Sequence, residues 1–239
     1  SELMRLFLDS YSLSWEKAWD LTTRTCAYTN HTLMSEAMEK WPVSMFGRLL
    51  PRHLEIIFEI NRRFLKEVSL RWPDDSKRLA RMSIIEEGHD AQVRMAYLAV
   101  VAGFSVNGVA ALHSELLQQD LFHDFYQLWP AKFNNKTNGV TQRRWLASSN
   151  PALSQLITDT IGDGWTTDLQ QLRKLIPFSD DAAFRARWRE VKLTNKVRLA
   201  ALVQADCGVS FDVDAMFDVQ VKRIHEYKRQ LLNILHLIH

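Results

Sequence analysis

The residue types most suited to chemistry gather near the carboxyl end of the sequence, in the stretch Val221–Arg229. Lys222, Arg223 and Lys228 supply ammonium and guanidinium groups within this short span. Such groups at the start of a helix bind phosphate, because their charge, their hydrogen-bond donors and the helix dipole act on the same anion. The stretch therefore predicts a phosphate clamp. A solvated basic helix face, or a patch that binds a partner, is the alternative interpretation.

The elements around this stretch decide how the cations are placed. Phe217, Val219 and Val221 alternate with polar residues, which predicts a strand, and a helical pattern begins only after Arg223. Ligands of open α/β sheets bind beyond the carboxyl ends of strands. We therefore expect the clamp at a strand-to-helix junction, with Lys228 about one turn into the helix.

A second polar cluster, Tyr28–Thr32, follows a short predicted strand at Cys26–Thr29. Its histidine, His31, stands among hydroxyl and amide side chains, which suit a hydroxyl-rich ligand that needs paired donors and acceptors. The alternative is that Thr32 caps a helix and that His31 is satisfied structurally.

Two further stretches carry weaker signals. The polar run at 134–139 indicates a boundary or linker, and it leads into a helix that contains Trp145. His113 is followed by Ser114 and Glu115, but neighbours on a helix point in different directions, so these three residues do not predict a catalytic triad. A packed structural role is the favoured interpretation of His113.

Helices dominate the remaining pattern. A helix is predicted over Pro51–Arg71, with Glu59 and Arg63 paired on its outer face. A second long helix is expected from about Asp180 to Cys207, and shorter ones at 14–24, 75–87, 108–118, 152–161 and 166–174. The apolar run Met95–Ala102 predicts a buried parallel strand. Strands separated by helices indicate a helix-rich α/β fold.

Composition narrows the function classes. The 239 residues carry 30 Lys and Arg against 28 Asp and Glu, a net charge of +2 that argues against a nucleic-acid binder. No apolar stretch is long enough to span a membrane. The two cysteines, Cys26 and Cys207, form neither a disulfide framework nor a zinc pattern, which favours a reducing, cytoplasmic location and no metal. Glycine-rich phosphate loops are absent. Both ends of the sequence lie in apolar helical patterns, so we expect an internal piece of a larger protein.

Taken together, these stretches resemble the α-glucan phosphorylase family, which includes glycogen, starch and maltodextrin phosphorylases. The sequence segments that carry the resemblance are distributed over nearly the whole chain: Thr25–Thr32, Leu49–Ile57, Val106–Ala110, Lys136–Gly139, Arg143–Leu146 and Lys222–Gln230.

The resemblance implies a reversible reaction with an α-glucan and inorganic phosphate. Phosphate cleaves the terminal α-1,4 bond of the glucan and releases glucose 1-phosphate with retention of configuration. The family uses pyridoxal 5′-phosphate through its phosphate group, and the lysine that carries this cofactor is expected outside the present sequence. The chain by itself is therefore expected to be inactive, and the parent enzyme to be a homodimer.

The resemblance also assigns roles to individual residues. It implies that Arg223 and Lys228 hold the substrate phosphate, and that His31 assists catalysis near the primary alcohol of the sugar. Asn138 and Tyr227 are implied as contacts of the glucosyl unit. Lys222 and Trp145 are implied as cofactor contacts, by the cofactor phosphate and in the cofactor pocket respectively.

The implied fold is a pair of Rossmann-like domains of the GT-B type. Residues 1–137 would form the carboxyl-terminal part of the first domain, and residues 138–239 the start of the second, cofactor-binding domain. A rival hypothesis is a catalytically inactive helical interaction module that has kept a phosphorylase-like sequence.

Overall fold

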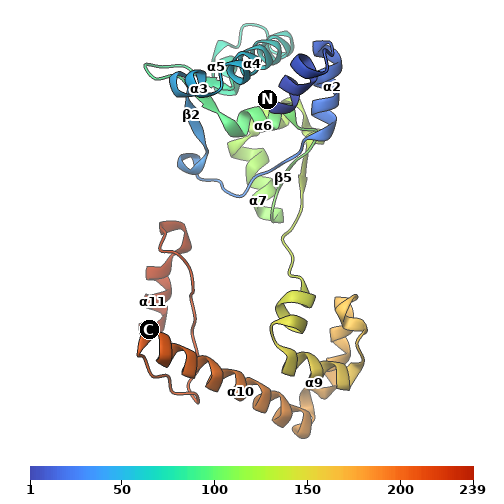
Figure 1. Cartoon of the computed structure of the whole chain (residues 1–239), viewed down its shortest axis with the longest axis vertical. Coiled ribbons are helices and arrows are strands. Elements are labelled where there is room, and N and C mark those ends of the chain that lie inside the picture. Colours follow the sequence, from blue (N-terminus) through green and yellow to red (C-terminus); the bar gives the residue numbers. More distant parts are fainter. The chain divides into compact units, whose positions relative to one another are not determined.

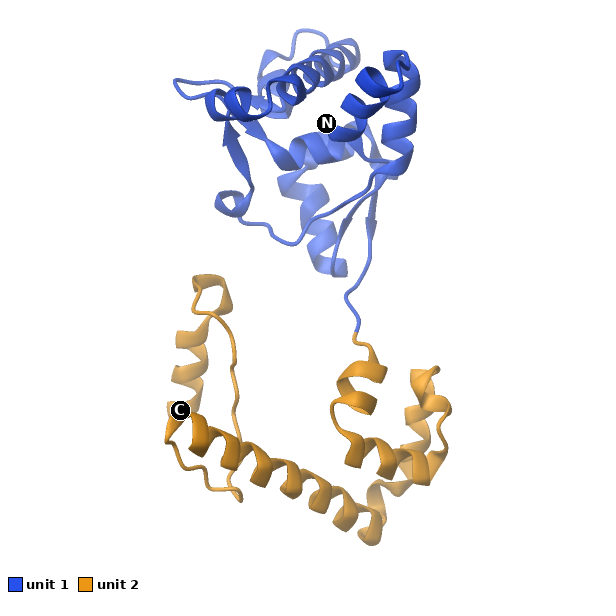
Figure 2. Ribbon diagram, in the orientation of Figure 1, with its two compact units in different colours: residues 1–139 blue, residues 140–239 orange.

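The computed structural model describes all residues, 1–239, and divides them into two compact units, residues 1–139 and 140–239 (Figure 2). The division falls at the end of the polar run at 134–139, which the sequence indicates as a boundary or linker. Each unit has its own apolar cluster. None of the helices is long and apolar enough to cross a membrane.

The first unit is an α/β structure with two small sheets (Figure 1). One sheet is parallel in the order β1-β5-β6, and the other is antiparallel in the order β2-β4-β3. The strands are β1 Tyr28–Thr29, β2 Lys40–Pro42, β3 Ile85–Glu86, β4 Gln92–Arg94, β5 Val106–Gly108 and β6 Phe133–Asn135. The α-helices are α1 Glu2–Arg5, α2 Trp15–Thr25, α3 Val43–Leu49, α4 Pro51–Arg71, α5 Ser76–Met82, α6 Met95–Ala102, α7 Ala111–Leu116 and α8 His123–Leu128. π-helical segments at Leu6–Ser10 and Leu117–Leu121 continue α1 and α7, and short 3₁₀ segments lie at Ser35–Ala37 and Pro130–Lys132.

The long helix α4 forms where the sequence predicts it. Pro51 occupies its first turn, and the buried face of the helix carries a stripe of Leu54, Ile57, Ile60, Phe64 and Val68. The stripe packs into the core of the first unit because its three- and four-residue spacing keeps these side chains on one side.

The second unit is helical. It contains α9 Pro151–Ile161, α10 Ala182–Cys207 and α11 Gln230–Ile238, with π or 3₁₀ segments at Arg143–Ser148, Gly164–Thr166, Leu169–Asp180 and Glu226–Lys228. Its core surrounds the fully buried Trp165, and Phe184, Trp188 and Val191 of α10 pack against that core. Gly208 ends α10 in the left-handed region, at φ 70°.

The strand predicted at Met95–Ala102 is wrong, because this segment is the helix α6. An apolar run without periodicity does not separate a buried strand from a buried helix. Here most of the residues are Ala, Leu or Met, which favour the helix, and only Val100 and Val101 bring β-branching against it.

The strand predicted around Phe217, Val219 and Val221 is also wrong. The segment has no pairing strand, and Val221 remains 87% exposed. The helix that follows begins at Gln230 and not after Arg223, because Arg229 adopts a left-handed conformation with φ 52° that interrupts the helical path.

Three shorter predictions need smaller corrections. The helix expected at 75–87 ends at Met82 and gives way to β3, and the one expected at 108–118 is α7 followed by a π-helical turn. The segment predicted as a helix at 166–174 is a 3₁₀ helix over Leu169–Asp180. The coarse prediction of a helix-rich α/β chain is confirmed.

Candidate functional site

The parallel sheet of the first unit brings three chain segments to one edge. β5 lies between β1 and β6, with Thr29 paired to Asn107 and Gly108 paired to Asn135. Since all three strands run in the same direction, the residues that follow them meet at the carboxyl edge, which is where open α/β sheets bind ligands. We call the residues that follow these strands, Asn30–Thr32, Val109–Ala110 and Lys136–Asn138, the sheet edge.

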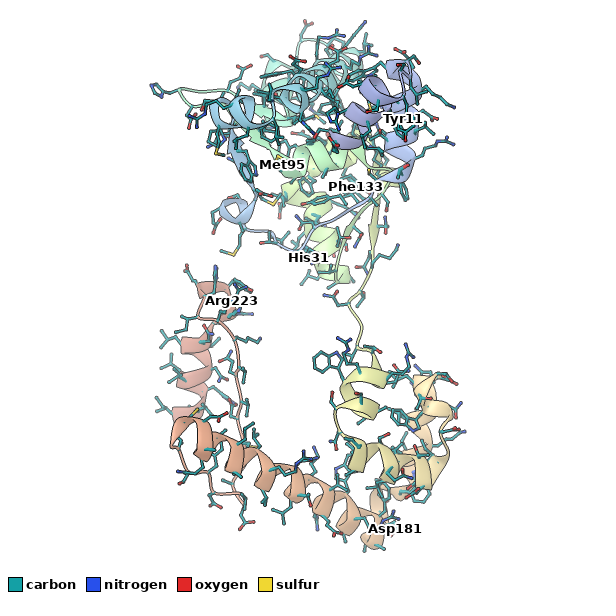
Figure 3. All side chains as sticks on the ribbon, viewed as in Figure 1. Tyr11, His31, Met95, Phe133, Asp181 and Arg223 are labelled. Carbon is teal, nitrogen blue, oxygen red and sulfur yellow. The ribbon has the colours of Figure 1, made fainter.

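Two of the predicted site residues belong to the sheet edge. His31 is an exposed residue just after β1, labelled in Figure 3, and Asn138 is an exposed residue just after β6. The backbone N–H of Asn138 donates to the carbonyl of Val109 at 3.0 Å, which fixes the β6 end against the β5 end. The topology thus gathers residues that are 107 positions apart in sequence, 31 and 138, at one edge of the sheet.

A network of side chains beneath the edge holds these segments. The Thr29 hydroxyl donates to Oδ1 of Asn107 at 2.9 Å. Asn30, 1% exposed, accepts the N–H of Thr32 on Oδ1 at 2.9 Å and donates from Nδ2 to the Tyr28 hydroxyl at 3.1 Å. Buried amides with every partner satisfied are rigid, so the turn that carries His31 has one defined shape.

The third strand is tied in by the first turn of α7, which packs against β5 and β6 (Figure 1). The Ser114 hydroxyl donates to Oδ1 of Asn135 at 2.9 Å, and the amide of Asn135 donates to the Thr137 hydroxyl at 2.9 Å. Gly108 makes this packing possible, because a Cβ at that position would lie 2.5 Å from Oγ of Ser114 and 2.9 Å from its backbone N.

The structure confirms a packed role for His113. Its Nδ1 receives the N–H of Val109 at 3.0 Å and its Nε2 lies 3.0 Å from Oδ1 of Asn30. Burial is the main cause that lowers the pKa of His113, and the nearby His31 lowers it further, while the backbone of Thr32 opposes the shift. A neutral ring is therefore favoured at the sheet edge.

The remaining predicted site residues lie in the second unit. Trp145, 65% exposed, is in the π-helical segment Arg143–Ser148. Lys222 and Arg223 lie in a segment without regular secondary structure, and Tyr227 and Lys228 lie in the single 3₁₀ turn Glu226–Lys228. Figure 3 labels Arg223 in this region. The expected placement of Lys228 inside a helix is therefore wrong, since α11 begins only at Gln230.

The basic segment, by which we mean residues 222–229, is held by one glutamine. The side chain of Gln230 donates to the carbonyl of Arg223 at 3.0 Å and accepts the N–H of His225 at 3.2 Å. The cations of Lys222, Arg223 and Lys228 form no ion pair, and Lys228 Nζ lies 5.7 Å from the Tyr227 ring centroid. Unpaired cations on a short loop remain available to an anion.

The sequence patterns missed most of the network beneath the sheet edge. Asn30 follows β1, Asn107 lies inside β5 and Asn135 ends β6, but strands of two or three residues are too short to place from sequence. Buried Asn30 and Ser114 are the residues that give the edge its rigidity.

A helix-rich α/β unit with donors and acceptors gathered beyond the carboxyl ends of parallel strands is typical of a protein that binds a small polar ligand. Residues 1–239 match the family described as carbohydrate phosphorylase, so the chain belongs to that family.

Curated relatives agree with this membership. The chain is 55% identical over 239 residues to a glycogen phosphorylase of Synechocystis sp., and 53% identical over 237 residues to the muscle form of glycogen phosphorylase of Homo sapiens. It is 51% identical over 238 residues to glycogen phosphorylase 2 of Dictyostelium discoideum. These alignments cover 99–100% of the chain but 28%, 28% and 24% of those proteins, so the chain spans about a quarter of the length of the relatives it matches.

Proposed function

We propose that the full-length protein carrying this sequence is an α-1,4-glucan phosphorylase. It transfers the terminal glucosyl unit of glycogen or a maltodextrin to inorganic phosphate. The α-1,4 C–O bond at the terminal anomeric carbon breaks, a new C–O bond to phosphate forms with retention, and the departing sugar oxygen takes a proton. The observation that carries this proposal is the match of the whole chain, at 53–55% identity, to proteins named glycogen phosphorylase.

The sheet edge supplies the sugar contacts in this proposal. His31 and Asn138 offer an imidazole and an amide from strand ends that the network beneath them fixes. Such groups pair with sugar hydroxyls and stabilise an oxocarbenium-like transition state by position and electrostatics. Tyr227, 58% exposed, is the third proposed contact of the glucosyl unit.

The basic segment supplies the phosphate contacts. Arg223 offers a planar fork of donors and Lys228 a point charge, and no carboxylate neutralises either. We propose that these two residues hold the substrate phosphate while it gives its proton to the departing sugar oxygen.

The cofactor of the proposed enzyme is pyridoxal 5′-phosphate, and the donor chemistry of two residues fits it. Lys222 is an exposed cation without an acidic partner, suited to a phosphate group, and the Trp145 ring is 65% exposed, suited to lining an aromatic ring. When bound, pyridoxal phosphate would supply a phosphate group for acid–base chemistry. Lys222 would hold that group by charge, and Trp145 would exclude water from its surroundings.

The proposal includes the architecture and setting of the family. Residues 1–137 would belong to the first and 138–239 to the second of two Rossmann-like domains of the GT-B type. The enzyme would be a cytoplasmic homodimer that binds neither nucleic acid nor membrane, and the chain of 239 residues alone would not turn over substrate.

The test is phosphate-dependent release of glucose 1-phosphate from maltodextrin by the full-length protein. Arg223→Ala should lower kcat/KM by about 100-fold or more, because a charged donor to the transferring group is lost. Arg198→Ala is the matched control, since Arg198 is exposed on α10 outside the proposed site.

Full activity in a folded Arg223→Ala protein would contradict the role of Arg223. Absence of any phosphorolysis in the unaltered full-length protein would contradict the enzyme itself and favour the inactive interaction module.

A further inference from the structure

His113 stands at the centre of the sheet edge although it belongs to none of the three strands. It lies in α7, and its ring spans the gap between the segment after β1 and the segment after β5. Its two ring nitrogens form hydrogen bonds with Asn30 and Val109, and neither partner is a charged group.

The hydrogen-bond partners fix the tautomer of the ring. The N–H of Val109 donates to Nδ1, so Nδ1 carries the lone pair. Nε2 then carries the proton and donates to Oδ1 of Asn30. The same oxygen accepts the N–H of Thr32. Because a backbone N–H can only donate, this bond identifies the Asn30 atom as the amide oxygen without reference to the His113 ring.

Both partners of the ring are directly connected to residues of the proposed sugar site. Asn30 precedes His31 in the chain and fixes the turn that carries it, through the 2.9 Å bond from Thr32. Val109 accepts the N–H of Asn138 at 3.0 Å. The path from the turn of His31 to the backbone of Asn138 therefore runs through Asn30, His113 and Val109.

We propose that His113 is a positioning residue of the sugar site, which, as the neutral Nε2–H tautomer, holds His31 and Asn138 at a fixed separation. The inference rests on the proposed function. It assigns His113 no contact with substrate and no proton transfer. The hydrogen bond from Val109 needs an uncharged ring, because a proton on Nδ1 would face the N–H of Val109.

The groups around the ring are consistent with a neutral form. His31 is the titratable group that faces it from the β1 side, and its electrostatic interaction with the ring lowers the pKa of His113. Burial lowers the pKa of His113 in the same direction. Ser114, next in α7, uses its hydroxyl on Ala110 and Asn135 and leaves the ring to its two partners.

Two substitutions separate hydrogen bonding from packing. His113→Phe keeps a ring of similar size and removes both hydrogen bonds. His113→Gln places an acceptor and a donor on one amide, which can restore both bonds. His89→Phe is the control, because His89 is an exposed residue of the same unit and forms no side-chain hydrogen bond.

The first measurement is hydrogen exchange of the full-length protein, followed by mass spectrometry of peptides that contain Thr32 and Asn138. We expect faster exchange at both places in His113→Phe than in His89→Phe, and near-normal exchange in His113→Gln. Exchange in α4 should be the same in all three variants, which shows that the unit is folded.

The second measurement is steady-state phosphorolysis. In His113→Phe, kcat/KM for the glucan should fall by about 10- to 100-fold, the effect of a small misplacement of contacting groups. The KM for phosphate should stay within about twofold, because the phosphate contacts lie in the other unit. His113→Gln should recover most of the activity.

Equal exchange and equal kinetics in His113→Phe and His89→Phe would overturn the inference. Equal damage in His113→Phe and His113→Gln would also overturn it, since the ring would then matter only for packing. If the unaltered protein shows no phosphorolysis, the proposed function fails, and the exchange comparison alone decides whether His113 holds the sheet edge.

Discussion

Replacement of Gly108 by alanine tests the packing that brings the three strand ends together. An alanine Cβ would lie 2.5 Å from Oγ, 2.9 Å from Cα and 2.9 Å from N of Ser114. The hydroxyl can rotate away, but the two backbone atoms cannot, so the first turn of α7 has to move. That movement would strain two hydrogen bonds of 2.9 Å. The Ser114 N–H donates one to the carbonyl of Ala110, and the Ser114 hydroxyl donates the other to Oδ1 of Asn135.

The expected cost is about 1–3 kcal/mol, the usual range for a side chain forced into a filled space. For a unit of this size, each kcal/mol corresponds to a fall of about 4 °C in Tm, so we expect a fall of about 4–12 °C. Gly139→Ala is the control, because no atom lies within 4 Å of a Cβ there and its φ is not in the left-handed region. Its effect should stay within about 0.5 kcal/mol.

The assay is thermal unfolding of the 239-residue chain, with hydrogen exchange in α4 used to assign the transition of the first unit. A double variant, Gly108→Ala with Ser114→Ala, separates the two causes of strain. If the backbone contact dominates, removal of the hydroxyl will not restore stability. Equal Tm values for Gly108→Ala and Gly139→Ala would refute the reasoning.

Three further predictions concern buried polar and aromatic groups. Asn61→Ala removes the acceptor that receives the N–H of Ile84 at 2.8 Å and should cost about 1–3 kcal/mol in urea unfolding, because a buried donor is left unpaired. Trp165→Ala should cost about 3–5 kcal/mol and melt the second unit alone, as read by hydrogen exchange, since Trp165 is fully buried in that unit and bonded to Thr158. Burial lowers the pKa of Lys132 from 10.5 to about 8, so between these values the unfolded chain binds more protons and the free energy of unfolding should rise with pH. Lys132→Met should lose that slope; an identical slope in both proteins would contradict the burial of the ammonium.

The sequence predicted long elements well because their patterns repeat. In α4 the spacing of apolar residues, the proline of the first turn and the pair formed by Glu59 and Arg63 at 2.6 Å all agree with one another. Several independent signals point to the same helix, so an error in one of them does not matter. The capping of α10 by Gly208 is predictable for the same reason.

Short and fully buried elements were not predictable in this way. The run Met95–Ala102 is apolar on every side, and its helical form depends on contacts with the rest of the core. The strands β1 and β5 comprise two and three residues, too few for a pattern, and only their pairing makes them a sheet. Their carboxyl edge, and with it the placement of His31 and Asn138 together, depends on that tertiary pairing.

The interruption before α11 is a different kind of failure. The helical pattern after Arg223 is real, but Arg229 lies in the left-handed region and the side chain of Gln230 caps the preceding turn by bonding the carbonyl of Arg223. A local side-chain bond competes with the helix here, and composition does not reveal it.

The sheet edge and the basic segment are held by different means, so we expect substitutions in them to have different effects. The sheet edge stands on buried groups, so changes there alter stability together with function. The basic segment has no buried residue and depends on the bonds of Gln230 to Arg223 and His225. Gln230→Ala should therefore raise the KM for phosphate in the full-length protein and leave Tm unchanged.

Gln170→Ala is the matched control, because Gln170 is exposed and its side chain forms no hydrogen bond. The measurement is the KM for phosphate at saturating maltodextrin, together with thermal unfolding of each variant. We expect a rise of about fivefold or more for Gln230→Ala, since two hydrogen bonds worth about 1 kcal/mol together are lost from a loop that must present Arg223 in one orientation. A large fall in Tm without a change in KM would mean that Gln230 supports α11 and not the phosphate contacts. Such a result would mean that contacts with the rest of the full-length protein, and not the hydrogen bonds of Gln230, determine the conformation of the basic segment.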